Sequence, residues 1–175
     1  ETKTFHLYNE EISYIMCVLE NGHMGQLYYG KRIHDKPDFS YLVEKCGRPM
    51  TSYIFEGDRS FSLEHIRQEY PVYGTTDYRH PAIEIMQENG SNISEFKYVG
   101  YEILKGKPSL KGLPATYTES EEEAETLKII LKDSLTGAKL TLLYTIFSKG
   151  SAIARSAHIC NEGEKVLHLQ TMMSL

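Results

Sequence analysis

Apolar and polar residues alternate with a period of two along much of the chain, which is the pattern of a β-strand with one buried face. In the segment 138–146, apolar residues occupy every second position, and lysine or threonine fills most of the positions between them. The segments 127–132 and 153–159 repeat this alternation, and short polar stretches separate the three segments. The pattern predicts three consecutive antiparallel strands, a β-meander.

Strand-like runs also occupy the first half of the chain and its last residues. We expect strands over residues 4–8, 12–19, 25–29, 82–87, 93–104 and 169–175. Asn21-Gly22 and Asn89-Gly90 follow such runs, and this dipeptide predicts hairpin turns because both residue types tolerate positive φ. The glutamate-rich stretch 119–125 lacks the apolar stripe of a docked helix, so we interpret it as a solvated acidic loop.

The composition fits one globular domain. A chain of 175 residues with 41% hydrophobic residues is long enough to bury a core without disulfides or metals. Thirteen tyrosines reinforce the strand prediction, because aromatic residues pack well on a pleated sheet. We therefore expect an all-β fold with few or no helices over residues 1–175.

Charge and cysteine content exclude several classes of protein. The formal net charge of -5 and the scattered basic residues argue against a nucleic-acid partner. No apolar run approaches the roughly 20 residues of a membrane helix, so we expect no membrane association. Cys17, Cys46 and Cys160 form no CxxC spacing, which disfavours a disulfide framework or a zinc site and suggests a reducing, cytoplasmic setting.

The usual catalytic motifs are missing from the sequence. The seven histidines form no HExxH pattern, and the glycines form no phosphate-binding or dinucleotide-binding motif. No serine lies in a GxSxG context, and single carboxylates cannot be paired from one sequence. We therefore expect no metal site and no cofactor, and residue spacing alone identifies no enzyme.

The stretch 70–82 concentrates tyrosines, backbone breakers and two opposite charges. Tyr73, Asp77 and Arg79 are the side-chain types that bind sugars, through a ring face, a carboxylate and a guanidinium fork. A structural interpretation is also open: Gly74 helps to form a bend, Asp77 pairs with Arg79, and the tyrosines fill the interface between sheets. We favour the structural interpretation.

Segments 58–63 (DRSFSL) and 68–82 (QEYPVYGTTDYRHPA) resemble the N-terminal domain of glycoside hydrolase family 36 α-galactosidases. Segments 28–31, 105–108 and 112–117 resemble the same domain in the same order, so the resemblance spans essentially the whole chain. It implies a β-supersandwich of two large antiparallel sheets, similar to galactose mutarotases, which agrees with the period-two pattern.

The same resemblance implies that catalysis takes place outside these residues. The resemblance implies a parent enzyme with a retaining mechanism, which uses two aspartates of a (β/α)8 barrel that follows this domain. The Lys-Trp-Asp nucleophile motif is absent, and the chain contains no tryptophan. We therefore expect a non-catalytic domain of a melibiase that acts on melibiose and raffinose-type galactosides. The expected partners of this domain are the C-terminal barrel of the same chain and the other subunits of a homotetramer.

The resemblance also implies substrate contacts in trans. In the segment 58–63, Arg59 matches a family arginine that approaches the substrate site of a neighbouring subunit, and we group Asp58 and Arg48 with it. Alternatively, Arg59 is a surface residue paired with Asp58 or Glu56. A family aspartate about a dozen residues before that arginine has no clear counterpart, because this region carries Glu44 instead.

Two other functions stay open. A free-standing galactoside-binding module would use exposed tyrosines as its contacts: Tyr28, Tyr29, Tyr73 or Tyr78. An enzyme similar to aldose epimerases would need a histidine acid and a glutamate base, and His80 with Glu84 is the nearest such pair.

Overall fold

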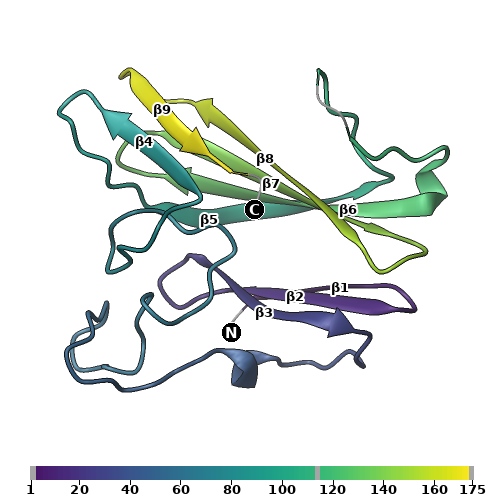
Figure 1. The fold of residues 1–175 in the computed structure, drawn as a ribbon, viewed down its shortest axis with the longest axis horizontal. Helices are drawn as coiled ribbons and strands as arrows, with labels where there is room; N and C mark the ends of the chain where they lie inside the picture. The colour runs from purple at the N-terminus through teal and green to yellow at the C-terminus, as the bar shows by residue number, and fades with distance from the viewer. Residues whose placement is uncertain (1–2, 113–114, 174–175) are drawn as a thin grey trace.

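The computed structural model describes residues 3–112 and 115–173, which fold into antiparallel sheets (Figure 1). Apart from two 3-10 turns, Ser40–Leu42 and Glu121–Glu123, these residues contain no helix, so none that could cross a membrane. The all-β prediction is confirmed. The nine strands are β1 (Thr4–Tyr8), β2 (Ile12–Val18), β3 (Met24–Lys31), β4 (Ile83–Gln87), β5 (Phe96–Lys105), β6 (Ala124–Asp133), β7 (Ala138–Phe147), β8 (Ile153–Asn161) and β9 (Leu167–Met172).

The strands form three antiparallel sheets. The order of the largest is β5-β6-β7-β8, so the predicted meander is confirmed. A three-stranded sheet, β1-β2-β3, forms the opposite layer in Figure 1. Strands β4 and β9 pair with each other as a separate ribbon, although about eighty residues lie between them. The end of the predicted 169–175 strand, residues 174 and 175, lies outside the described residues.

The main core lies between the two larger sheets. Its fully buried members include Met16 of β2, Ile129 of β6 and Leu140 of β7. In β7 the buried positions alternate with half-buried ones up to Tyr144, as a strand with one face on a core requires. Hydrophobic burial between the two layers is therefore the main source of stability.

A second apolar cluster covers the other face of the three-stranded sheet. Ile15 and Cys17 of β2 contact it from the sheet side, and the irregular segment 33–66 supplies Phe39 and Phe61. Burial raises the pKa of the Cys17 thiol to about 12, so this cysteine stays protonated and packs as an apolar residue. The segment between β3 and β4 is thus packed onto the sheet although it lacks strands.

The two Asn-Gly dipeptides behave differently. At Asn21-Gly22 the chain turns directly from β2 into β3, with Gly22 at φ 87°, so this predicted hairpin is confirmed. At Asn89-Gly90 the chain also turns, with Gly90 at φ 80°, but the predicted hairpin is wrong. Strand β4 pairs with β9 and strand β5 pairs with β6, because partners distant in the sequence complete both sheets.

A buried polar network joins the layers at Glu69. The Glu69 carboxylate accepts hydrogen bonds from the Tyr14 hydroxyl of β2 at 2.8 and 2.9 Å and from the Tyr144 hydroxyl of β7 at 2.8 Å. Arg155 Nη2 of β8 lies 3.2 Å from Glu69 Oε2. Burial raises the pKa of Glu69 and of both tyrosines. One side chain therefore connects the two larger sheets and the segment that precedes β4.

Candidate functional site

Hydrogen bonds and a buried apolar anchor order the backbone of the loop that carries Arg59. The Asp58 Oδ1 atom accepts hydrogen bonds from the Ser60 backbone N–H at 2.8 Å and the Ser60 hydroxyl at 2.6 Å. These hydrogen bonds lower the pKa of Asp58. Phe61 and Leu63 follow and are fully buried in the second cluster. The backbone at Arg59 is thus ordered by a local turn and an adjacent apolar anchor.

The Arg59 side chain is exposed. Within residues 3–112 and 115–173, no ion pair joins it to Asp58, Glu56 or any other carboxylate. The surface pair considered from the sequence is therefore absent from the described part of the chain, because Asp58 binds Ser60 instead. The guanidinium is available to an external carboxylate or hydroxyl group.

Arg48 lies on the neighbouring segment. The Cys46 backbone N–H donates to the Ser60 carbonyl at 3.1 Å, which places the two loop segments side by side. Unlike Arg59, Arg48 has a partner on its own segment: its Nη2 lies 3.6 Å from Glu44 Oε1, and both side chains are about half exposed. An exposed pair of this length contributes little to stability. The Glu44 carboxylate is thus paired with Arg48 in this structure.

Two large side chains are exposed in the irregular loop between these arginines. Met50 is fully exposed and has φ 61°, a left-handed conformation that non-glycine residues rarely adopt. Tyr53 is 46% exposed. Exposed methionine, tyrosine and arginine side chains are enriched in protein interfaces. No periodic pattern could identify these residues, since their exposure depends on how the irregular segment packs.

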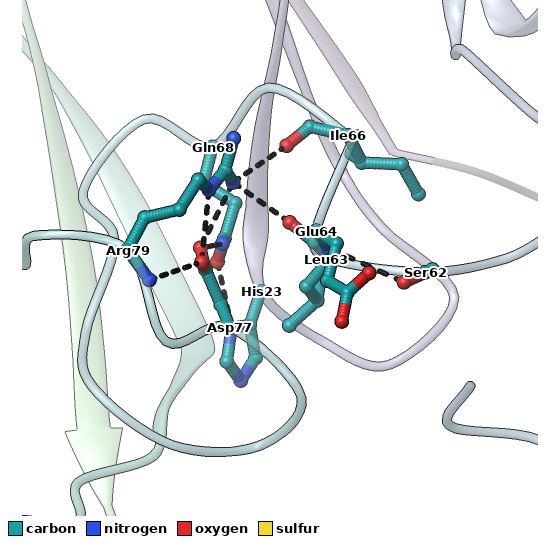
Figure 2. Close-up of polar contacts among 8 residues, drawn as sticks. All are labelled: His23, Ser62, Leu63, Glu64, Ile66, Gln68, Asp77 and Arg79. Atoms are coloured by element: carbon teal, nitrogen blue, oxygen red, sulfur yellow. Dashed lines mark hydrogen bonds and ion pairs between the residues drawn. The ribbon is translucent and has the colours of Figure 1, made fainter. Parts of the chain in front are cut away.

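Asp77 and Arg79 form an internal pair, as the structural interpretation predicts (Figure 2). Asp77 is 1% exposed, and its carboxylate accepts two hydrogen bonds from Arg79 at 2.9 Å and one from the Gln68 amide at 2.6 Å. Arg79 Nη2 also donates to the Leu63 carbonyl at 2.7 Å and lies 3.3 Å from the Ile66 carbonyl. Through these hydrogen bonds, the pair connects the 70–82 stretch to the segment that follows Arg59.

Two further residues, His23 and Gln68, extend this network and could not be linked to it from the sequence. His23, from the β2-β3 turn, contacts Gln68 with its Nδ1 atom 3.2 Å from the amide oxygen (Figure 2). Burial lowers the pKa of His23, which favours the neutral ring. His23 and Asp77 are far apart in the sequence, and no spacing signal could have linked them.

The tyrosines of the stretch do not all behave as predicted. Tyr70 is buried, and its hydroxyl hydrogen-bonds the Met173 carbonyl at 2.5 Å. Tyr73 and Tyr78 are instead 39% and 62% exposed, and their rings meet edge to face at 5.5 Å. The prediction that the tyrosines fill the interface between sheets is wrong for these two, because the turn between them directs both rings outward.

The turn at Gly74 is strained. Gly74 has φ 105°, and a Cβ atom there would lie 2.8 Å from Ile93 Cγ2, so the position requires glycine. Thr75 and Thr76 follow with φ 48° and 73°, and backbone hydrogen bonds join Gly74 and Asp77 in both directions. Positive φ is rare for β-branched residues, and such turns normally use asparagine and glycine.

The histidine and glutamate required by an epimerase-like site have other partners. His80 Nδ1 lies 3.0 Å from the Pro81 carbonyl oxygen, and Glu84 accepts a hydrogen bond from the Asn92 amide at 3.0 Å. The described residues contain no group of three or more histidine, cysteine or acidic side chains that could hold a metal ion.

Comparison with known proteins gives consistent matches along the chain. The family model of the glycosyl hydrolase family 36 N-terminal domain matches residues 22–175. α-Galactosidase AgaA of Geobacillus stearothermophilus is 42% identical over the whole chain. α-Galactosidase 1 of Pediococcus pentosaceus is 35% identical over 99% of the chain. In both cases the chain spans 24% of the relative's length.

Solved structures agree with this similarity. A variant of AgaA crystallised with raffinose superimposes on 98% of the chain with a TM-score of 0.92. The α-galactosidase of Lactobacillus brevis, 37% identical, superimposes on 98% of the chain with a TM-score of 0.93. The chain covers 24% and 23% of these two structures. The similarity thus extends from sequence to fold.

Proposed function

Because this chain belongs to the N-terminal domain family of glycosyl hydrolase family 36, we propose that it is the non-catalytic N-terminal domain of a retaining α-galactosidase. The parent would release terminal α-linked galactose from melibiose and raffinose-type oligosaccharides. AgaA, 42% identical, has been crystallised with raffinose and with stachyose, which supports this substrate class. The single observation that carries the proposal is that the whole chain aligns with 24% of the length of an α-galactosidase.

Catalysis is assigned to a (β/α)8 barrel elsewhere in the parent. The relatives are about four times as long as this chain, which leaves room for such a barrel. The chain carries no Lys-Trp-Asp motif. Expressed alone, residues 1–175 should therefore hydrolyse no aryl α-galactoside, whereas the parent should hydrolyse it.

The domain would contribute to the substrate site of a neighbouring subunit through Arg59, in a homo-oligomer. Support comes from an exposed arginine on a backbone ordered by Asp58 and Ser60, in the same irregular segment as the exposed Met50 and Tyr53. Because the backbone of this loop is already ordered, binding a hydroxyl or carboxylate group would cost the loop little additional backbone entropy. Asp58 would act by positioning the loop, because its carboxylate is already hydrogen-bonded.

Kinetics of the full-length parent test the role of Arg59. Arg59→Ala should lower kcat/KM for raffinose by about tenfold or more, equivalent to about 1.4 kcal/mol, and leave the melting temperature unchanged. Arg67→Ala is the matched control, because Arg67 is also exposed but lies outside the loop. Equal kcat/KM values for the two variants would exclude a substrate contact by Arg59.

Mixed oligomers test whether the contact acts in trans. Subunits that carry Arg59→Ala with an active barrel would be dissociated and reassembled with subunits that lack the barrel nucleophile but retain Arg59. Contact in trans predicts that activity on raffinose rises after mixing, since the inactive subunit supplies the missing arginine. No gain in mixed oligomers of confirmed composition would contradict the proposal.

The exposed pair Tyr73 and Tyr78, beside the half-exposed Arg79, is the observation that favours a galactoside-binding module. In that case the parent with an inactivated barrel would bind melibiose at a second site in addition to the barrel. Tyr73→Ala with Tyr78→Ala would remove that second site and lower the binding stoichiometry in calorimetry. We expect the heat of melibiose binding to be the same with and without these two substitutions.

A further inference from the structure

The inner face of β5 is left uncovered at one end. Tyr101 and Ile103 lie opposite Ile129 and Leu127 of β6 in the strand register, so all four side chains point to the same face of the sheet. Ile129 and Leu127 are 0% and 6% exposed, as core residues should be. Tyr101 and Ile103 are 45% and 58% exposed. The core-facing side of β5 therefore lacks a covering element here.

The facing sheet ends one strand too early to cover β5. It has three strands where the opposite sheet has four, and β1 is its strand on this side. The outer edge of β3 is bonded by the segment 67–69, through the Gln26 and Glu69 backbone N–H groups at 2.9 Å. In residues 3–112 and 115–173, nothing comparable bonds the outer edge of β1.

The hydrogen-bonding groups on that edge can be assigned from the ladder. Val18 N–H donates to the Lys3 carbonyl, and Asn9 N–H donates to the Ile12 carbonyl, so odd-numbered residues of β1 face β2. In an antiparallel pair the alternate residues point the other way. The N–H and C=O groups of Thr4, His6 and Tyr8 therefore face the open edge and await a strand.

A groove of about 490 Å³ lies between these two features. One wall is β1 from Lys3 to Tyr8, and the floor includes Tyr101, Ile103 and Leu127. The Lys3 ammonium lies over the Tyr101 ring at 4.4 Å from its centroid, a cation-π contact at the rim. An extended segment placed here would satisfy the edge of β1 and cover the apolar floor at the same time.

We propose that an extended segment of the parent polypeptide, from outside these 175 residues, adds to β1 as a fourth strand and covers Tyr101 and Ile103. The relatives contain about three quarters of their length beyond the region matched by this chain, so such a segment exists in proteins of this family. A permanent strand also explains why an apolar floor and an unpaired edge lie together in this structure. The proposal rests on family membership and not on the role of Arg59.

Substitutions in the full-length parent test whether the floor is covered. Ile103→Arg should lower the melting temperature by several degrees, because it would place a charge under the added strand. Val99→Arg is the matched control, since Val99 lies on the same strand, is 61% exposed and does not line the groove. Equal melting temperatures for Ile103→Arg, Val99→Arg and the unmodified parent would overturn the proposal.

Photocrosslinking identifies the segment. A photoreactive amino acid in place of Ile103 would be activated in parent oligomers assembled from mixed isotopically light and heavy chains. The proposal predicts crosslinks to a peptide outside residues 1–175 and only within chains of one isotope. Light-to-heavy crosslinks would assign the groove to a second copy, and crosslinks only within residues 1–175, or none, would show that no added strand covers it; each outcome contradicts the proposal.

Discussion

At the scale of single residues, two arginines of this domain lie in opposite environments. Arg79 is tied to the buried Asp77 and to two backbone carbonyls, whereas Arg59 has no carboxylate partner among the described residues. Both belong to segments that carry the family resemblance, and the sequence left a pair with a nearby carboxylate open for each of them. Their surroundings do, because a buried acceptor holds one guanidinium and the other projects from an irregular loop.

Removing the Arg79 guanidinium should destabilise the domain. Arg79→Ala would leave the buried Asp77 carboxylate without its cation, and breaking a buried pair in this way costs about 3 kcal/mol. We expect the lower end of the usual range, because Arg79 is itself half exposed. Denaturant unfolding measures the loss. Arg48→Ala, which breaks an exposed pair, should cost less than about 1 kcal/mol; equal losses would contradict the role of burial.

Relieving the strained turn should stabilise the domain. Thr76 has φ 73°, and its hydroxyl oxygen is buried without a hydrogen-bond partner among the described residues. Thr76→Gly removes the steric cost and the unpaired oxygen, so stability should rise by about 1 kcal/mol. The change in melting temperature is the measurement. Ser91→Gly, at a half-buried position that has no positive φ to relieve, is the comparison. A loss of stability in Thr76→Gly would show that the threonine makes an unrecognised contact.

At the scale of strands, local patterns were sufficient where one face is buried. The alternation in 138–146 matches β7 almost residue for residue, and the predicted strand 4–8 has the bounds of β1. The pattern could not identify strand partners. Asn89-Gly90 forms its turn, yet β4 pairs with β9, because the partner that buries the β4 edge comes from the far end of the chain.

Two leucines of β7 test the face assignment. Leu140 is 0% exposed in the core between the sheets, and Leu143 is half-buried on the opposite face. Leu140→Ala should cost about 2–5 kcal/mol through lost burial and a residual cavity. Leu143→Ala should cost about 1 kcal/mol or less. Denaturant unfolding of both variants gives the comparison, and similar losses would mean that the strand does not present one face to the core.

At the scale of the whole molecule, the layers are joined by apolar packing and by one buried carboxylate. Glu69 receives hydrogen bonds from strands of both larger sheets and pairs with Arg155. Such a network specifies how the layers are aligned, although burying a charge costs free energy. Glu69 precedes the aromatic stretch by one residue, and its partners come from β2, β7 and β8.

This network should make stability depend on pH. Burial raises the pKa of Glu69 above its ordinary value of 4.5, so the folded state binds this proton more tightly than the unfolded chain. The stability that Glu69 adds relative to Glu69→Gln should therefore be greatest below about pH 4.5. It should decline as the pH rises through the folded-state pKa. Chemical denaturation of both proteins across a pH series measures this difference; an advantage that grows with pH would mean that Arg155 and the tyrosines outweigh the cost of burial.

The all-β class, most strand positions and the family resemblance can be predicted from the amino-acid sequence, because these depend on local alternation and on contiguous motifs. It also suggested the Asp77–Arg79 pair, whose members are two residues apart. The folded chain was needed to show that Tyr73 and Tyr78 face outward, that Glu69 joins two sheets and that Arg59 has no ionic partner among the described residues. Those properties depend on contacts between residues far apart in the chain, and one-dimensional patterns carry no information about such contacts.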